Sequence, residues 1–392
     1  MLNFEYTQPT KFVFGKGAET HAGEELKALG GTKALIHFGG GSAVKSGLIA
    51  RVEKSLEEAG LSYVELGGAV PNPRDTKVYE GIALVKKEKC DCILAVGGGS
   101  AIDSAKAIAH GSVYDGDFWD LWSGKAKVTK TLPLGCVLTL SATGSESSNS
   151  SVIMQEKTKL KRGLRSDFNR PKFALMNPEL TFTLPKYQIA CGATDIMAHI
   201  MERYFTNEKE VGVTDYLCEA LLKTIIQYAP IAYKNPSDYD AQAQIMWAGT
   251  LAHNDTCGVG RLGDWASHQI EHELSAMYDV AHGAGLAVVF PAWMKYTLDN
   301  DVMRFARFAV NVFGCDMNFE NPKATALEGI ERYKSFLKSI GMPVTMQALG
   351  AKKEDIPYMA KNTKRGPDGK VGAFMKLDTE DVEAILNIAC DE

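Results

Sequence analysis

The chain has 392 residues, of which 45% are hydrophobic and 23% charged, a mixture typical of a folded globular protein. A formal net charge of −5 without a basic stripe argues against nucleic-acid binding. No apolar run is long enough to span a membrane, no signal peptide is visible, and the eight cysteines form no disulfide framework. We therefore expect a cytoplasmic protein of two domains.

The first half of the chain alternates short apolar runs with stretches of helical periodicity. Five runs predict strands, of which the first and third read as buried: Lys33–Phe38, Ser62–Leu66, Cys92–Val96, Pro133–Leu140 and Lys172–Met176. Between two of them, Val78, Ile82 and Val85 recur at helical spacing. Strands and helices that alternate at this interval predict an α/β domain with a doubly wound parallel sheet over residues 1–185.

After Leu184-Pro185 the pattern changes to long amphipathic stretches with few strand-like runs. The predicted helices include Gln188–Phe205, Thr214–Tyr228, Tyr239–Asn254 and Trp265–Met277. We therefore predict an all-α C-terminal domain over residues 186–392. Asp355–Gly372 is charged and glycine-rich, which indicates an exposed loop within that domain.

Two predicted strands end in the same Gly-Gly-Gly-Ser turn, at Gly39–Ser42 and at Gly97–Ser100. Glycine lets backbone N–H groups and the start of the next helix approach a phosphate closely. One such turn is weak support and also fits a plain strand-to-helix connection, but two in one α/β domain favour a bound dinucleotide. Asp103 and Lys106 follow in the first turns of a helix, where we favour a cofactor role over a dipole partner and a salt bridge.

Two common nucleotide-binding patterns are missing from the sequence. The pattern G-x-G-x-x-G fails because Thr20 stands where a third glycine would follow Gly15 and Gly17. No P-loop occurs either, which argues against a nucleotide hydrolase. Thr139–Glu146 is a third strand end rich in hydroxyl groups, whose threonines either hold ribose or adenine or cap a helix.

Histidines gather in one stretch of the second half. His268, His272 and His282 lie within Trp265–Gly285, and His268 and His272 are four residues apart, on one face of a helix. Asp195 and His199 repeat that spacing upstream. A single histidine of this kind is best explained as a satisfied polar residue at a helix edge. Two spaced pairs and a further histidine favour a site for a divalent ion such as Fe²⁺ or Zn²⁺.

These motifs together resemble the iron-containing (group III) alcohol dehydrogenase family, which has the dehydroquinate-synthase-like fold. The motifs that carry the resemblance are F-G-K-G at 14–17, P-N-P at 71–73, G-G-G-S-A-I-D-S-A-K at 97–106, T-L-S-A-T-G-S-E at 139–146, G-A-T-D-I-M-A-H-I-M-E at 192–202 and H-x3-H-x9-H-G-A-G at 268–285. Within the family, G-G-G-S at Gly39–Ser42, D-W-A-S-H and H-E-L-S-A-M are similar to the butanol dehydrogenase and broad-specificity aldehyde reductase branch.

The resemblance implies specific site residues. The ligands of a catalytic divalent metal would be Asp195, His199, His268 and His282. His272 would lie beside the metal, either as a proton relay or as a hydrogen-bond partner of a ligand. The dinucleotide site would comprise Gly39, Gly40, Ser42, Asn72, Gly97, Gly98, Gly99, Ser100, Asp103, Thr139, Thr143 and Lys161. In this set Asp103 would face the nicotinamide, which places it with His272 among the expected catalytic residues.

The sequence departs from the family pattern at two places. Asn177 stands where members often carry aspartate. Gly39 stands where relatives that reject a 2′-phosphate tend to carry aspartate, so the repulsion against that phosphate is missing and NADP(H) is tolerated. Members that use NADH also carry the glycine turn, and both NADP(H) and NAD(H) stay open.

The resemblance implies a metal-dependent, NAD(P)-linked alcohol dehydrogenase and aldehyde reductase for small aliphatic substrates such as butanol and butanal. The metal, Fe²⁺ in preference to Zn²⁺, would act as a Lewis acid on the substrate oxygen, and the nicotinamide would carry the hydride. A homodimer is expected from the resemblance and because dimers are the commonest soluble assembly.

Other functions fit the same fold. A glycerol dehydrogenase-type polyol oxidoreductase and a dehydroquinate synthase-type lyase are the nearest alternatives. A lyase pocket for an acid phosphate should be rich in Lys, Arg and Asn, whereas apolar residues flank the predicted metal helices: Met197, Ile200, Met246, Trp247, Leu251, Trp265 and Leu274. A non-enzymatic metal- or nucleotide-binding protein is a further alternative. The full set of predicted ligands argues against it.

Overall fold

The structure is a computed structural model that describes residues 1–391. The chain divides into two compact units. One comprises Thr7–Thr183, and the other comprises Met1–Tyr6 together with the chain from Leu184 onward. The predicted boundary lies after residue 185, with the first six residues in the α/β domain, whereas in the structure those six residues belong to the helical unit. Within the described residues, no helix combines the length and apolarity needed to cross a bilayer.

The α/β unit contains a six-stranded sheet in the order β1-β8-β5-β4-β2-β3, and every pairing is parallel. Its strands are β1 (Lys11–Phe14), β2 (Lys33–Phe38), β3 (Ser62–Leu66), β4 (Cys92–Gly97), β5 (Leu134–Leu138) and β8 (Phe173–Met176). The central strands β4, β5 and β8 are buried along their whole length, which explains their continuous apolar sequences. All five strands predicted from apolar runs are confirmed, with small differences at their ends.

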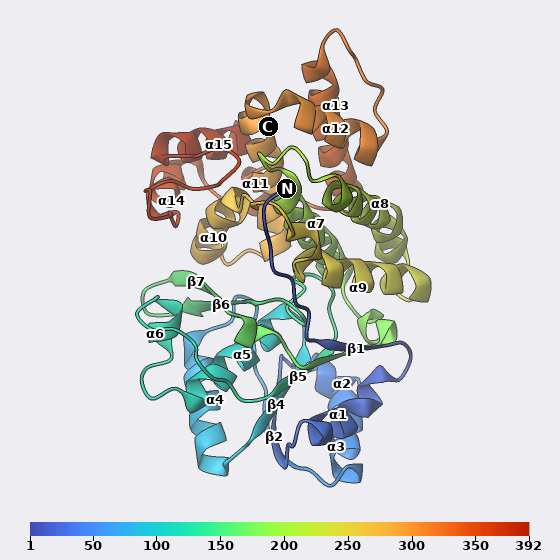
Figure 1. The fold of residues 1–392 in the computed structure, drawn as a ribbon, viewed down its shortest axis with the longest axis vertical. Helices are drawn as coiled ribbons and strands as arrows, with labels where there is room; N and C mark the ends of the chain where they lie inside the picture. The colour runs from blue at the N-terminus through green and yellow to red at the C-terminus, as the bar shows by residue number, and fades with distance from the viewer. Residues whose placement is uncertain (392) are drawn as a thin grey trace. The chain divides into compact units, whose positions relative to one another are not determined.

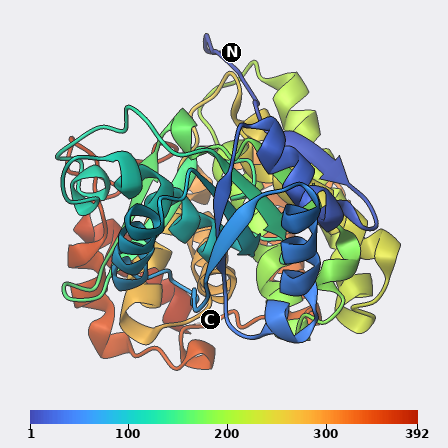
Figure 2. The same ribbon diagram turned by 90° about the horizontal axis from the view of Figure 1, so that it is seen from below.

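Helices cover both faces of this sheet. Helices α1 (Ala22–Ala28) and α3 (Leu48–Glu58) lie on one face, and α4 (Asp75–Glu88) and α5 (Gly99–Val113) lie on the other (Figures 1 and 2). Helix α3 turns Leu48, Val52 and Leu56 toward the strands, as its spacing requires. Two shorter helices are α2 (Ser42–Lys45) and α6 (Trp119–Trp122). The predicted doubly wound architecture is confirmed.

A two-stranded antiparallel hairpin stands apart from the main sheet and was not predicted. It consists of β6 (Ser150–Gln155) and β7 (Leu160–Arg165), paired with Met154 opposite Lys161. The sequence of β7, Leu-Lys-Arg-Gly-Leu-Arg, is basic and contains a glycine. It therefore lacks the apolar alternation by which a strand is recognised.

The second unit is helical, which confirms the predicted class of the C-terminal domain. Its helices are α7 (Lys186–Tyr204), α8 (Gly212–Lys234), α9 (Tyr239–His253), α10 (Ala266–Tyr278), α11 (His282–Thr297), α12 (Val302–Phe313), α13 (Pro322–Ser339), α14 (Ile356–Asn362) and α15 (Thr379–Asp391) (Figure 1). Aromatic rings fill its core, where Phe205 stacks on Phe305 at 4.5 Å between ring centroids and contacts Trp293 at 5.5 Å.

The prediction of an exposed loop over Asp355–Gly372 is wrong for its first part. Helix α14 occupies Ile356–Asn362, and Ile356, Met359 and Ala360 are buried. These residues are three and four positions apart, which places them on one face of the helix. Charged residues surround this short apolar face in the sequence, so its helical pattern was not recognised.

Candidate active site

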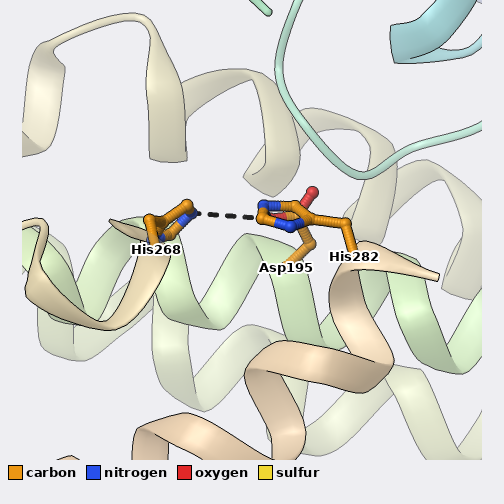
Figure 3. A group of neighbouring side chains, drawn as sticks. All are labelled: Asp195, His268 and His282. Atoms are coloured by element: carbon orange, nitrogen blue, oxygen red, sulfur yellow. Dashed lines mark ion pairs between the residues drawn. The ribbon is translucent and has the colours of Figure 1, made fainter. Parts of the chain in front are cut away.

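Three predicted metal ligands come together in the helical unit. Asp195 lies on α7, His268 on α10, and His282 is the first residue of α11. Their ligand atoms all lie within 4.8 Å of one another. Asp195 Oδ1 is 3.9 Å from Nε2 of His268 and 3.7 Å from Nε2 of His282, so both rings face one carboxylate oxygen (Figure 3).

The fourth predicted ligand, His199, lies one turn after Asp195 on α7. Its Nε2 is 3.7 Å from Asp195 Oδ1, and its ring stacks on that of His268 with 4.8 Å between centroids. It is not a member of the set whose ligand atoms all lie within 4.8 Å. The structure therefore gathers the three predicted histidine ligands around Asp195, with the closest grouping formed by Asp195, His268 and His282.

The chemistry of this cluster fits a divalent metal ion. Nε2 of His268 and Nδ1 of His199 are buried and have no hydrogen-bond partner. A buried polar atom without a partner is costly, and a cation facing His268 Nε2 would remove that cost. Burial lowers the pKa of His268 to about 3 and holds the pKa of His199 well below its ordinary value. Both imidazoles are therefore neutral, the form that coordinates a metal.

A buried carboxylate on α7, Glu202, orients the ring of His268. Its Oε1 lies 2.8 Å from His268 Nδ1 and accepts the backbone N–H of His268 at 3.0 Å, and its Oε2 accepts the backbone N–H of Trp265 at 2.6 Å. Glu202 thus satisfies backbone donors at the start of α10 and occupies one ring nitrogen of His268. The other ring nitrogen is left to face Asp195, as in metal sites where a carboxylate supports a histidine ligand.

A second buried carboxylate, Glu271, supports His282 in the same way. Its Oε2 contacts His282 Nδ1, and its Oε1 contacts the hydroxyl of Ser275. Neither Glu202 nor Glu271 is among the site residues predicted from the sequence. Each is three residues after a predicted ligand, His199 and His268 respectively, and this helical spacing was the available signal.

The glycines of the H-G-A-G segment allow α11 to begin at the site. A Cβ on Gly283 would lie 2.1 Å from the carbonyl oxygen of Cys191 on α7. A Cβ on Gly285 would lie 2.6 Å from Oε1 of Glu271. Only glycine permits the first turn of α11, and with it His282, to come this close to α7 and Glu271.

His272 lies next to these residues but outside the Asp195 cluster. Its ring centroid is 5.7 Å from that of His282, and it forms a second close group with Glu271 and His282. Its side chain is neither fully buried nor fully exposed. Its expected part in proton transfer stays a prediction.

In the α/β unit, both glycine turns follow adjacent strands. Gly39–Gly41 follows β2, and Gly97-Gly98-Gly99 joins β4 to α5. The chain leaves β2 for β3 on one side and later returns to β4 on the other, so these turns lie where the strand order reverses. Parallel α/β sheets usually bind ligands at this point of the carboxyl edge.

The third predicted segment packs directly on the second turn. A Cβ on Gly98 would lie 3.0 Å from Cβ of Leu140, and one on Gly99 would lie 2.3 Å from Oγ1 of Thr143. The backbone N–H of Thr139 bonds to Gly97 O at 3.0 Å. The structure therefore brings Gly97–Ser100 and Thr139–Thr143 together. Their contact with a dinucleotide stays a prediction.

Other predicted cofactor residues have different surroundings. Asn72, between two prolines, is buried and has a left-handed φ of 52°. Ser42 begins α2, and Gly40 has open space where a Cβ would stand.

Lys161 on β7 is buried, and its charge opposes the rise in the pKa of Asp103 that burial causes. The carboxylate of Asp103 is also bonded within the protein, to Ser145 Oγ at 2.5 Å and to the backbone N–H of Val152 at 2.8 Å.

Lys106 does not have the exposure that a cofactor contact requires. It is fully buried, and its Nζ donates to Ser145 Oγ at 2.8 Å and to Ser150 O at 2.7 Å. Burial lowers its pKa to about 8. Lys106 therefore ties the serine-rich loop after Thr143 to α5, and the cofactor role favoured for it from sequence is not supported.

The apolar residues proposed to flank an aliphatic substrate belong largely to the core. Met197, Ile200, Met246 and Leu274 are fully buried. Trp247, by contrast, is 40% exposed. Helical periodicity placed these apolar residues on helix faces. It did not distinguish residues of the core from residues near the site.

Comparisons with known proteins identify the family of this chain. A family model for iron-containing alcohol dehydrogenases matches residues 9–178, and one for the C-terminal region of the Fe-containing alcohol dehydrogenase family matches residues 189–390. The NADH-dependent butanol dehydrogenase A of Clostridium acetobutylicum is 43% identical over 98% of this chain and 99% of its own. The NADPH-dependent aldehyde reductase YqhD of Escherichia coli is 35% identical over 92% of each chain.

A solved structure shows the same similarity in three dimensions. The crystal structure of NADH-dependent butanol dehydrogenase A from Thermotoga maritima has a TM-score of 0.96 and 43% identity, and the match covers 100% of this chain and 99% of that one. The resemblance to the butanol dehydrogenase and aldehyde reductase branch is thereby confirmed. This chain belongs to the iron-containing alcohol dehydrogenase family.

Proposed function

We propose that this protein is a metal-dependent, NAD(P)-linked alcohol dehydrogenase and aldehyde reductase that acts on small aliphatic substrates such as butanol and butanal. The observation that carries the proposal is the convergence of His268 and His282 on one oxygen of Asp195, each held by a buried glutamate. The names of the similar proteins, butanol dehydrogenase and aldehyde reductase, support the reaction and the substrate class.

In this proposal Asp195, His199, His268 and His282 hold a divalent ion. When bound, the ion supplies a Lewis acid that polarises the carbon–oxygen bond of the substrate. Glu202 and Glu271 keep the Nδ1 atoms of His268 and His282 engaged, so that each Nε2 stays directed at Asp195. His272, next to Glu271 and near His282, passes a proton to the substrate oxygen during aldehyde reduction and takes it back during alcohol oxidation.

The dinucleotide, which supplies the hydride, binds in this proposal at the two glycine turns. Gly97, Gly98 and Ser100 approach the pyrophosphate, because the start of α5 offers backbone N–H groups there. Thr139 and Thr143 hold the adenosine side, Asp103 the nicotinamide side and Lys161 a ribose or phosphate. Gly39 leaves room for a 2′-phosphate, so both NADH and NADPH are accepted.

Elemental analysis before and after chelation, run beside butanal reduction with NADH and NADPH, tests the function. We expect a single divalent metal per chain and loss of activity on chelation, with recovery on return of Fe²⁺ or Zn²⁺. Changing His268 and His282 together to Ala should remove metal and turnover, whereas His21→Ala, at an exposed histidine outside the site, should change neither. Unchanged turnover after the metal has been stripped would refute the mechanism.

The assembly and location of the protein are further parts of the proposal. We expect a homodimer, which light scattering of the purified protein would measure, and a cytoplasmic enzyme. A single-chain mass at working concentrations would contradict the first expectation.

A further inference from the structure

His253 is a buried histidine that neither the predicted motifs nor the proposed function uses. It is the last residue of α9 and is 8% exposed. Its ring lies 3.9 Å from the ring of His199 between centroids, with 36° between the planes. Within the described residues it belongs to neither group of side chains close enough to share an ion. Binding of the ion therefore does not explain why His253 lies beside the predicted ligand His199.

The predicted histidine ligands differ in what supports their rings. His268 and His282 each have Nδ1 engaged by a buried glutamate. His199 has no such support, since its Nδ1 is buried and makes no hydrogen bond. Its ring instead contacts two other imidazoles, His253 at 3.9 Å and His268 at 4.8 Å with 21° between the planes. Contacts with these rings support His199, whereas a carboxylate supports each of the other two predicted ligands.

His253 is itself held in place by its neighbours. Its ring lies 5.7 Å from that of Trp265, which is covered by the guanidinium of Arg203 at 4.7 Å. Arg203 also donates to the backbone oxygen of His199 at 2.8 Å and pairs with Asp255 at 3.6 Å, two residues beyond the end of α9. The end of α9 is thereby fixed to the part of α7 that carries His199.

We propose that His253 is a positioning residue that fixes the imidazole of His199 by contact between ring faces. The inference rests on the proposed metal site. A histidine ring rotates about its Cβ–Cγ bond over a broad range when nothing restrains it. Without the face of His253, the ring of His199 would lose its nearest aromatic neighbour, and its Nε2 would no longer be held toward Asp195.

Two substitutions separate the face of the ring from its nitrogen atoms. His253→Phe keeps an aromatic face and removes both nitrogens, whereas His253→Gln keeps hydrogen-bonding atoms and removes the ring. The measurement is the affinity for Co²⁺, determined by competition with a coloured chelator, together with the visible absorption spectrum of the Co²⁺ protein. His110→Ala is the control, because His110 is also buried but lies in the α/β unit, bonded to Asn169.

We expect His253→Phe to bind Co²⁺ nearly as tightly as the unchanged protein and to retain its spectrum. His253→Gln should bind it about 10- to 100-fold more weakly, the range found when the support of a metal ligand is removed. His110→Ala should lower the melting temperature without changing Co²⁺ affinity.

Three results would overturn the inference. Equal loss in His253→Phe and His253→Gln would mean that a nitrogen of His253 matters and its face does not. Full affinity in His253→Gln would mean that His253 does not position His199. If the unchanged protein takes up no Co²⁺, the proposed function fails first, and the role of His253 fails with it.

Discussion

Glu202 is bonded twice to His268: one oxygen accepts the backbone N–H of His268 at 3.0 Å and lies 2.8 Å from Nδ1 of the same residue's ring. The other oxygen accepts the backbone N–H of Trp265 at 2.6 Å. One buried carboxylate thus fixes both the first turn of α10 and the ring direction of a predicted metal ligand on it. If His268 binds the metal as proposed, metal affinity and the stability of α10 are linked through Glu202.

Replacing Glu202 by Gln should weaken metal binding by about 10- to 100-fold, because a neutral amide supports the His268 ring less well than a carboxylate. Chelator competition measures this change. Glu219→Gln is the matched control, since Glu219 is also buried in the helical unit but bonds to Tyr204 and Arg307. Equal weakening by both substitutions would point to general destabilisation and contradict the specific role of Glu202.

Gly283→Ala should destabilise the helical unit by about 1–3 kcal/mol, because the added Cβ would lie 2.1 Å from the carbonyl oxygen of Cys191 and must push α11 away from α7. His282 would move with the helix, so metal content should fall as well. Thermal unfolding and elemental analysis are the two measurements. Gly212→Ala, where the nearest atom is 4.0 Å away, should leave both unchanged. A normal metal content in Gly283→Ala would count against the close approach described here.

His272→Asn should lower butanal reduction by about 100-fold, the scale of general acid–base catalysis, while the metal content stays unchanged. The physical reason is that His272 is absent from the close group around Asp195. Steady-state kinetics beside elemental analysis distinguish the two effects. Loss of metal in parallel with activity would instead assign His272 to the support of the metal site.

Gly39→Asp should raise KM for NADPH at least about tenfold and change KM for NADH little, because a carboxylate there repels a 2′-phosphate. The backbone tolerates the change, since a Cβ on Gly39 would lie 3.5 Å from Ala69 O, an ordinary contact distance. Gly40→Ala, where a Cβ meets open space, serves as the uncharged control. A similar effect on both cofactors would remove Gly39 from the determinants of cofactor choice.

The buried His37 on β2 should make the metal-free protein sensitive to acid. Burial lowers the pKa of His37 to about 4 from 6.5, although its Nδ1 lies 2.9 Å from Leu66 O. Below pH 6.5 the unfolded chain gains a proton that the folded chain does not, so stability is lost as the pH falls from 6.5 to about 4. The loss should be about 3 kcal/mol. Urea unfolding at pH 7 and pH 4 should show a smaller drop for His37→Asn; an equal drop would exclude His37 as a cause.

Much of the fold could be predicted because burial marks the sequence directly. β2 begins and ends at the predicted residues, since its buried apolar run stops at turns. The hairpin of β6 and β7 was missed because basic side chains interrupt its pattern, and α14 because its apolar face is short.

For the site, the predicted ligands form recognisable motifs, whereas Glu202 and Glu271 are marked only by a helical spacing of three residues from a predicted ligand. The structure places His268 and His282 beside Asp195, a proximity that helical spacing alone could not establish. Glu202 and His253 gain their significance from the packing of α7 against α10 and α9, and Glu271 from the packing of α10 against α11. No local pattern records those distances.

Because α11 begins beside α7, the supply of metal would affect how much of the protein is folded. Asp195 and His282 are far apart in the chain, so an ion held by both would act as a removable cross-link between helices. Binding to the folded chain alone shifts the folding equilibrium by mass action, by about 2.7 kcal/mol at a hundredfold excess of metal over its Kd. In cells starved of metal, the enzyme would therefore be less active and also less abundant, because proteases remove unfolded chains.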